Sequence, residues 1–572
     1  MDCFVIYFYS SPQNQTDKYD KMLVIEYFFI EIYSKYPMSL SPYTGQWTTA
    51  EAAHLLRRTL VGPKVDQINT AVTDGMLTTV SNLLTLPTLE DPITFSADEL
   101  YTSLGQTWIN DPLAVNSDPT IFQQNVAARN RSLLAWSSQR LYLNSDFSIA
   151  EKMTLFWQNH FAVELTNEPR ANYRFFSLLY NNCLGNVKQL VKDVTVEPAM
   201  LLFLNGNSNT LYSPNENFAR ELLELYTIGK GAQIGPGDYT NYTEQDVAEG
   251  ARIMTGWQLS TYNATSLPLV APYFNAFLHD TGTKTLSAAF NNAVITDNAA
   301  QEYADFIDVI FTQDECAKFI CRKLYRFFVN SEIDTTIETT VIDELANTLV
   351  TNNYAISPVI QELLTSQHFY DITYRGAIIK SPAEYMAGVY KSVGAPLNYD
   401  IQSNGEILTT VYYITGGAGM DYFAPPNVGG WTAYYLAPAF SRLWINSAYI
   451  KTRFDLSDWI TLYNGPSASS SGLNFENDAM ELLNSIATVT NAADPNNVVQ
   501  QLEILFACKP YGPSQFAGLK SILTNGLPDF EWTIQYNDYL ANPGDPVFSE
   551  PVENRVRQVL SYIFKSSEYH IQ

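Results

Sequence analysis

Apolar residues recur along most of this chain with the three- and four-residue spacing of amphipathic helices. The segment 315–329, ECAKFICRKLYRFFV, is typical, because its apolar residues fall on one side and its basic residues on the other. Alternation of apolar and polar residues is scarce, and ILTTVYYI (407–414) is a candidate strand. The pattern predicts a mainly α fold, a large irregular helical domain with long Gly/Pro/Asn-rich loops and at most a minor β element.

Helix-start signals support this prediction. A Ser or Thr followed three residues later by Glu, ahead of an apolar-periodic run, is the capping-box pattern. It occurs at Thr48/Glu51, Ser148/Glu151, Ser213/Glu216, Thr312/Glu315 and Ser381/Glu384. Five such pairs along one chain indicate a predominantly helical protein.

The same patterns divide the chain into four parts. Residues 38–463 are expected to form the main helical domain, 464–474 a linker, and 475–572 a C-terminal helical segment that packs on the main domain. Residues 1–37 are interpreted as a non-native start or a disordered extension. Their apolar run, MLVIEYFFIEIY, contains two glutamates and is shorter than the roughly 20 residues that a membrane span needs. We find no signal-peptide pattern in it.

Charge and cysteine content exclude some classes of function. The 572 residues carry a net charge of −26, and no Lys/Arg cluster offers the basic surface that nucleic-acid binding requires. We therefore expect no nucleic-acid partner and no transmembrane segment. The five cysteines are widely spread, which favours buried thiols over a disulfide framework. An oligomeric state cannot be read from the sequence.

The segment SPNENFARELLELYTIGKG (213–231) carries the most distinctive polar pattern. Ser213 is the expected N-cap, Gly229 ends the helix, and Arg220 is spaced for ion pairs with Glu216 and Glu224. Glu221 and Glu224 lie about one turn apart. They fit either a solvated helix face or a cleft in which two carboxylates bind a metal ion or act as an acid/base pair.

Further polar candidates occur in four other segments. His160 follows Asn159 among aromatic residues in FWQNHFAVE, and YTEQDVAEGARIMTGW ends in Trp257. The pair His279–Asp280 precedes a lysine in a predicted loop, where it could bind a metal ion, although such a doublet is a weak signal. PPNVGGW (425–431) is typical of a tightly packed turn. The chain has no GxSxG elbow, phosphate-binding loop, HExxH or dinucleotide fingerprint.

Taken in order, these segments resemble the bacterial domain of unknown function 1800 family. The resemblance runs from about residue 47 to the C-terminus. It rests on AAHLLRR, KMTLFWQNHF, EPAMLLFLNG, PNENFARELLELYTIGKG, YTEQDVAEGARIMTGW, HDTGTKTL, CRKLYRFFV, KSPAEYMAGVYKSVG and PPNVGGW. Gln158 departs from the family pattern, because many relatives have a second histidine there. This departure weakens a metal site built from two histidines.

The resemblance implies a large, mostly helical bacterial protein of a commonly exported family, often encoded beside a sulfatase-like protein that is the expected partner. No signal peptide is visible, so a cytoplasmic location stays open. The family motifs also select the site residues. We expect Glu221, Glu224 and His160 as catalytic residues, Asn159, Asn215, Arg220 and Trp257 as substrate-binding residues, and His279 and Asp280 as ligands of a divalent metal ion.

Two hypotheses of different class follow. In the first, the chain is a hydrolase-like enzyme that acts on an extracellular polymer or polysaccharide through its Glu/His site. In the second, it is a non-catalytic cell-surface or assembly protein in which the same residues form a buried ion-pair network. The composition is compatible with both.

Overall fold

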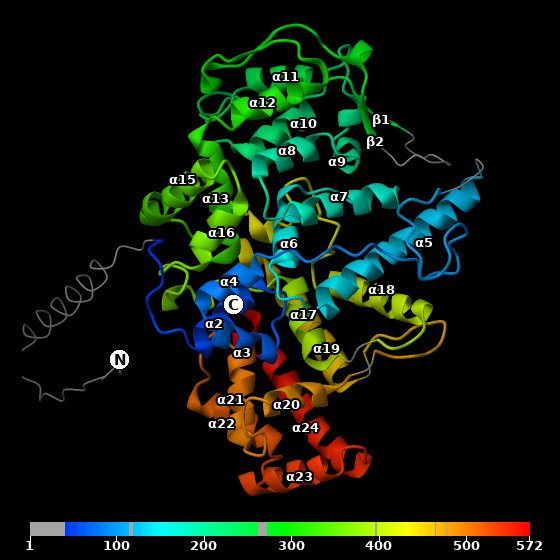
Figure 1. The fold of residues 1–572 in the computed structure, drawn as a ribbon, viewed down its shortest axis with the longest axis vertical. Coiled ribbons are helices and arrows are strands. Elements are labelled where there is room, and N and C mark those ends of the chain that lie inside the picture. The colour runs from blue at the N-terminus through cyan, green and yellow to red at the C-terminus, as the bar shows by residue number, and fades with distance from the viewer. Residues whose placement is uncertain (1–39, 114–117, 261–270, 395–396, 464, 476) are drawn as a thin grey trace, which may run out of the picture.

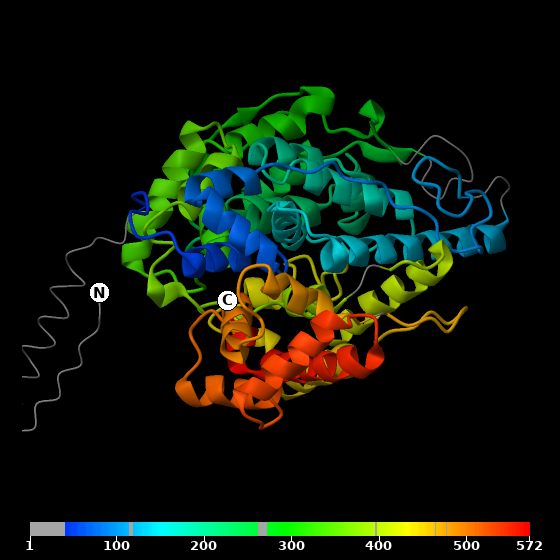
Figure 2. The ribbon, with the colours of Figure 1, turned by 60° about the horizontal axis from the view of Figure 1, so that its bottom comes forward.

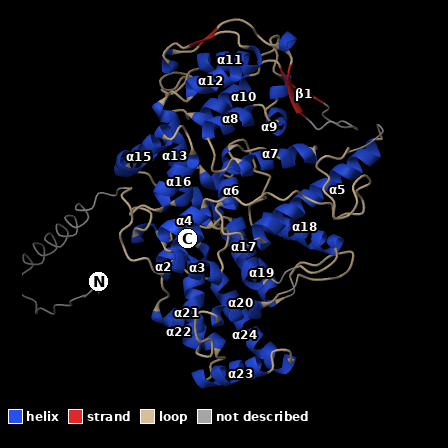
Figure 3. Ribbon diagram, viewed as in Figure 1, coloured by secondary structure: helices blue, strands red, loops and turns tan. Residues whose placement is uncertain are grey.

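The structure is a computed structural model, and it describes residues 40–113, 118–260, 271–394, 397–463, 465–475 and 477–572. The prediction for residues 1–37 lies outside these ranges. Helices dominate the described chain, and its only sheets are two small antiparallel pairs near one end of the molecule (Figure 3). The predicted fold class, mainly α with a minor β element, is therefore confirmed.

The α-helices are α2 Thr49–Thr59, α3 Val65–Asp74, α4 Met76–Leu83, α5 Pro119–Ser138, α6 Ala150–His160, α7 Pro169–Asn181, α8 Val187–Thr195, α9 Pro198–Phe203, α10 Glu216–Glu221, α11 Glu244–Ile253, α12 Glu302–Ile310, α13 Asp314–Phe328, α14 Thr335–Ile337, α15 Asp343–Thr351, α16 Ile356–Leu364, α17 Pro382–Val393, α18 Ile401–Gly417, α19 Ser447–Leu462, α20 Ala479–Ala487, α21 Pro495–Phe506, α22 Pro513–Leu523, α23 Asp529–Ala541, α24 Pro546–Lys565 and α25 Ser567–His570. Three π-helical turns continue helices: η1 Gln139–Leu143, η3 Leu222–Thr227 and η7 Glu338–Ile342. The 3₁₀ turns are η2 Gly206–Ser208, η4 Ala276–Leu278, η5 Ala288–Phe290, η6 Ala299–Gln301, η8 Ile372–Tyr374, η9 Thr432–Tyr434 and η10 Phe440–Trp444. The strands are β1 Trp257–Ser260, β2 Ala271–Phe274, β3 Lys284–Thr285 and β4 Val294–Ile295, paired β1–β2 and β3–β4.

The helices stack along the long axis of the molecule. Helices α8 to α12 lie at the top of Figure 1, α2 to α4 lie around its middle, and α20 to α24 gather at the bottom. One hydrophobic core runs through these levels and includes residues from Leu40 to Tyr569. All the residues discussed below as family motifs therefore belong to elements anchored in the same core.

The C-terminal helices pack on the rest of the chain. Helix α24 lies against α19, and the Tyr385 hydroxyl in α17 donates a 2.8 Å hydrogen bond to the carbonyl of Phe564. Figure 2 shows the same helices covering one side of the body. The boundaries of the linker at 464–474 stay a prediction.

Some local predictions are wrong. Residues 407–414 belong to α18 and not to a strand, because Asp400 caps the helix and α18 packs along α5, which outweighs the β-branched content. The capping boxes at Thr48/Glu51 and Ser381/Glu384 are confirmed. The other three predicted boxes do not form, and their helices begin at Ala150, Glu216 and Asp314.

Two further expectations concern the whole chain. Among the described residues, we find no helix with the length and apolar character needed to span a membrane. Four of the five cysteines are described, and all four are free and buried, as expected for thiols that pack as small apolar groups. Cys3 lies outside the described residues.

Candidate functional site

The segment 213–231 folds into α10 and continues as the π-helix η3. Asn215 is the N-cap in place of Ser213, and its side chain accepts a hydrogen bond from the backbone N–H of Asn217. Ser213 instead forms a β-bridge with Thr210, three residues earlier in the chain. The helix ends as expected, with Gly229 at φ +73°, a conformation that glycine adopts without strain. Asn215 therefore has a structural role that accounts for its side chain.

Arg220 joins α10 to α11. It contacts both carboxylate oxygens of Glu244 at 2.6 and 2.8 Å, and Glu216 at 3.3 Å. The expected pair with Glu216 forms, but Glu224 bonds elsewhere. The guanidinium is about one-third exposed, so water screens these pairs and each contributes little to stability.

Glu221 and Glu224 are both half-buried, yet their surroundings differ. Glu224 forms an ion pair with Lys230 at 2.5 Å and accepts a 3.2 Å hydrogen bond from the Tyr242 hydroxyl. The Glu221 carboxylate has neither a hydrogen bond nor an ion pair with a described residue. Burial and the charge of Glu224 raise the pKa of Glu221 above its ordinary value. The surroundings of Glu221 therefore favour its protonated form.

His160 is buried at the end of α6, where it binds the backbone of η3. One ring nitrogen, Nε2, lies 3.0 Å from the carbonyl oxygen of Tyr226, so it must donate. The other, Nδ1, lies 3.0 Å from Nζ of Lys323, which also donates to the carbonyl of Leu225 at 2.8 Å. Burial and the nearby Lys323 hold the pKa of His160 well below its usual range, which keeps the ring neutral.

His160 and Lys323 thus act together on the end of one helix. The last carbonyl groups of a helix lack backbone partners, and here two of them bind these two side chains. Burial lowers the pKa of Lys323 to about 7. The contacts assign His160 to positioning the helix that carries Glu221 and Glu224, and no described hydrogen bond joins it to either carboxylate.

Asn159 and Trp257 also have packing partners. The Asn159 side-chain oxygen accepts a 2.9 Å hydrogen bond from the backbone N–H of Trp431, which links KMTLFWQNHF to PPNVGGW. Trp257 pairs with Phe274 across the β1–β2 sheet and packs edge-on against Tyr303 of α12 at 5.5 Å. Both residues connect segments that lie far apart in the sequence.

His279 is buried and has both ring nitrogens engaged. Nδ1 lies 2.9 Å from the carbonyl oxygen of Thr255, and Nε2 lies 2.9 Å from Oε2 of Glu302. A carbonyl and a carboxylate are both acceptors, so both ring nitrogens must carry a proton. Burial alone would lower the pKa of His279, but the bonds to Glu302 and to the Thr255 backbone outweigh it and raise this pKa.

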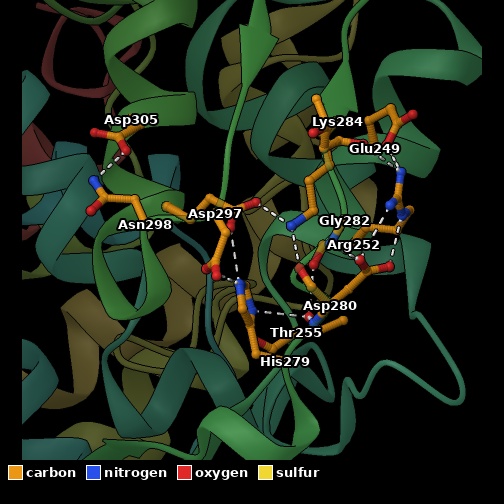
Figure 4. Close-up of polar contacts among 12 residues, drawn as sticks. Glu249, Arg252, Thr255, His279, Asp280, Gly282, Lys284, Asp297, Asn298 and Asp305 are labelled. Carbon is orange, nitrogen blue, oxygen red and sulfur yellow. Dashed lines mark hydrogen bonds and ion pairs between the residues drawn. The ribbon is translucent and has the colours of Figure 1, made fainter.

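The other charged residues of this cluster form ion pairs beside His279 (Figure 4). Lys284, fully buried, forms an ion pair with Glu302, which is also fully buried, and donates to the carbonyl of Asp280. The Asp280 carboxylate accepts two hydrogen bonds from Arg252, at 2.8 and 3.2 Å, and one from the N–H of Gly282 at 2.8 Å. The HDTGTK segment is thereby attached to α11 and to the start of α12.

The comparison with protein-family models finds a match that covers most of this sequence. The model of a protein of unknown function, DUF1800, matches residues 54–571. The chain belongs to the DUF1800 family. The searches found no match among curated proteins or among solved structures. The resemblance seen in the motifs is confirmed over nearly the whole chain.

One group in this DUF1800 chain has the composition of a metal site. Ligand atoms of His279, Asp297 and Glu302 lie within 4.8 Å of one another, and Asp297 replaces the predicted ligand Asp280, whose carboxylate is bound by Arg252. The charges favour a different interpretation. The buried Lys284 already forms an ion pair with Glu302, and the His279 ring donates to the same carboxylate, so a divalent ion would have to displace both contacts.

The sequence pattern did not reveal which side chains His279 and His160 contact. Glu302 is the central acceptor of the His279 cluster, but as the first residue of α12 it resembles an ordinary helix-start carboxylate. Lys323 was expected on the basic side of its helix, and it lies half-buried against His160. One sequence signal could have indicated a buried carboxylate near His279. HDTGTK contains a lysine, and a lysine that is buried with its loop needs a buried partner for its charge.

Proposed function

We propose that this protein is a non-catalytic binding or assembly protein of the bacterial cell surface, in which the polar family motifs form an internal network. One observation carries the proposal. Both candidate histidines, His160 and His279, are buried with both ring nitrogens engaged. Neither ring can accept a substrate proton or bind a metal ion without breaking a contact that holds two segments together.

The surface location and the sulfatase-like partner come from the family resemblance, and they remain part of the proposal. A protein that serves as a binding partner needs a rigid body, and the network supports this. It joins the loop from His279 to Lys284 to α11 through the partly buried Arg252–Asp280 pair and to the start of α12 through the fully buried Lys284–Glu302 pair. Removing one partner of the fully buried pair is strongly destabilising.

A second candidate is a hydrolase-like enzyme acting on an extracellular polymer. Glu221 favours it, because this half-buried carboxyl has a raised pKa and lies near Glu224, which is ion-paired with Lys230. Two carboxyl groups in different environments are the usual basis of acid/base catalysis. A metal-assisted variant would use His279, Asp297 and Glu302.

Glu221→Gln distinguishes the two candidates. The purified wild type and the variant are incubated with soluble polysaccharides and with cell-wall material, and the released reducing ends are counted. The binding protein predicts no release above buffer by either form. Release by the wild type that disappears in a folded Glu221→Gln variant would establish the enzyme instead. The matched control is Gln245→Ala, an exposed position on the neighbouring helix α11.

A further inference from the structure

A small cavity lies where the C-terminal helices meet the main body. Residues of α2, α17, α21 and α25 line it, together with loop residues next to these helices. Its volume is about 20 Å³, and one water molecule needs roughly 10–15 Å³ of such space. The cavity therefore holds a single group close to water in size. Two of its lining residues, Arg57 and Lys380, belong to the family segments AAHLLRR and KSPAEYMAGVYKSVG, and the proposed function gives neither of them a role.

The Lys380 ammonium lies at the wall of this cavity without an acceptor. The residue is 7% exposed, and its Nζ lies 3.9 Å from the centre of the Tyr569 ring, which lines the same cavity. No hydrogen bond or ion pair joins Nζ to a described residue. Nζ nevertheless keeps solvent-accessible surface, because it is not one of the fully enclosed polar atoms that lack a partner. Apart from the ring face, the ammonium therefore has only the cavity to face.

Arg57 brings a second cation to the same cavity. The residue is 6% exposed, and its Nη1 donates to the carbonyl of Ile504 at 2.6 Å. Its Nη2 bonds to no described residue and, unlike the enclosed Nε, keeps accessible surface. Burial and the charge of Arg57 lower the pKa of Lys380 to about 7, and burial lowers the pKa of Arg57 to about 10. Folding thus places two buried cations at one small space, and a negative charge in that space would stabilise both.

Glu384, the carboxylate side chain that lines the cavity, is already engaged. Its Oε1 forms an ion pair with Lys152 and accepts a 3.0 Å hydrogen bond from the side chain of Gln572. Its Oε2 accepts two hydrogen bonds from Ser381, each 2.8 Å long, from the backbone N–H and from the hydroxyl. Among the described residues, Gln572 forms no ion pair with a cation. The charge of Glu384 is therefore balanced by Lys152, and the two cations of the cavity keep no counter-charge within the described chain.

We propose that this cavity binds one chloride ion, which contacts Nζ of Lys380 and Nη2 of Arg57. Phosphate, sulfate and carboxylate ligands are larger than a single group of water size, and a metal cation would be repelled by the two buried charges. A water molecule fits the space but would leave both charges uncompensated, whereas buried charges are normally paired. Size and charge together therefore select a monatomic anion.

The ion stabilises the junction between the C-terminal helices and the main body. Arg57 belongs to α2 and bonds to the backbone of α21, while Lys380 precedes α17 and lies over the Tyr569 ring of α25. An anion that contacts both cations joins these segments, which come from opposite ends of the described chain. The inference goes beyond the proposed binding role and does not depend on it.

The test is urea unfolding in mixtures of sodium chloride and sodium gluconate at constant ionic strength, because gluconate is too large for the cavity. The pH is kept about one unit below 7, where Lys380 is charged. Above the Kd, each tenfold rise in chloride should lower the unfolding equilibrium constant of the wild type about tenfold, as one bound ion per folded chain implies. Lys380→Met should abolish this dependence, and it is expected to fold because it removes a buried charge without a partner. Lys509→Met, at an exposed lysine, should keep the dependence.

A measurement on the wild type alone locates the ion. Crystals grown in sodium bromide, at a concentration that saturates the stabilisation, should show an anomalous-scattering peak between Lys380 and Arg57. Two results would overturn the inference: a wild type whose unfolding responds to chloride no more than that of Lys380→Met, or bromide crystals without a peak in this cavity. Neither result touches the proposed binding or assembly role, which fails separately if the wild type cleaves a polymer through Glu221.

Discussion

Replacing Glu302 with Gln tests the network at its centre. The carboxylate is fully buried and accepts from the His279 ring at 2.9 Å while it neutralises Lys284. Glutamine keeps the shape but removes the charge, so a buried ammonium and a buried imidazolium lose their shared counter-charge. Removing one partner of a buried ion pair costs about 3–5 kcal/mol, and we expect a loss of this size in the unfolding free energy.

The measurement is hydrogen exchange of peptides from 276–310, followed by mass spectrometry, because it reports the local opening free energy of this region. Asp297→Asn is the matched control. Its side chain is 45% exposed and lies 3.8 Å from His279, so we expect this variant to change the local opening free energy by less than about 0.5 kcal/mol. The double variant Lys284→Met/Glu302→Gln should recover part of the loss, because the unpaired ammonium is gone. A Glu302→Gln effect below about 1 kcal/mol would refute the reasoning, because surface positions change stability by comparable amounts.

Three further predictions use other contacts. In urea titrations at pH 7, Glu221→Gln should raise the free energy of unfolding by a few tenths of a kcal/mol, the usual size of a like-charge helix pair. This gain should vanish in acid, because a carboxyl group with a raised pKa destabilises the fold only when it is ionised. Glu224→Gln, which loses its ion pair with Lys230, should lower the free energy of unfolding in the same titration. The raised pKa of His279 means that its contribution is complete below about pH 6.5 and is lost as the pH rises through the higher folded value, so His279→Asn should flatten the pH profile of urea unfolding above pH 6.5. Gly282→Ala should lower the free energy of unfolding by about 0.5–1.5 kcal/mol in thermal or urea unfolding, the usual contribution of one hydrogen bond, because its Cβ would lie 2.7 Å from Nη2 of Arg252 and would displace this atom from Asp280. Equal stability of either of the last two variants and wild type at every pH would contradict the contact geometry.

Local sequence signals predicted the fold class well, because each helix start depends on residues that lie only a few positions apart in the sequence. Thr48 and Ser381 cap their helices as the pattern requires. Ser213 fails because Asn215, two residues later, is an equally good cap and leaves Ser213 to bridge with Thr210. The segment 407–414 fails because packing on α5 decides between helix and strand for a short apolar run.

The candidate site was predicted less well, because its partners are distant in the sequence. His279 and Asp280 were recognised as a polar pair, but whether they bind a metal ion depends on Lys284 and Glu302, and the pairing of Glu302 is a property of the folded chain. The same holds for His160, whose partner Lys323 is 163 residues away.

The most direct test of the central claim measures metal content and thermal unfolding together. The account predicts that purified wild type carries no stoichiometric divalent metal by elemental mass spectrometry and that its melting temperature is unchanged by a chelator or by added Zn²⁺, Mn²⁺, Mg²⁺ or Ca²⁺. The charge balance of His279, Lys284, Asp297 and Glu302 is the reason. One equivalent of metal that stabilises the wild type and is lost in both Asp297→Asn and Glu302→Gln would contradict it.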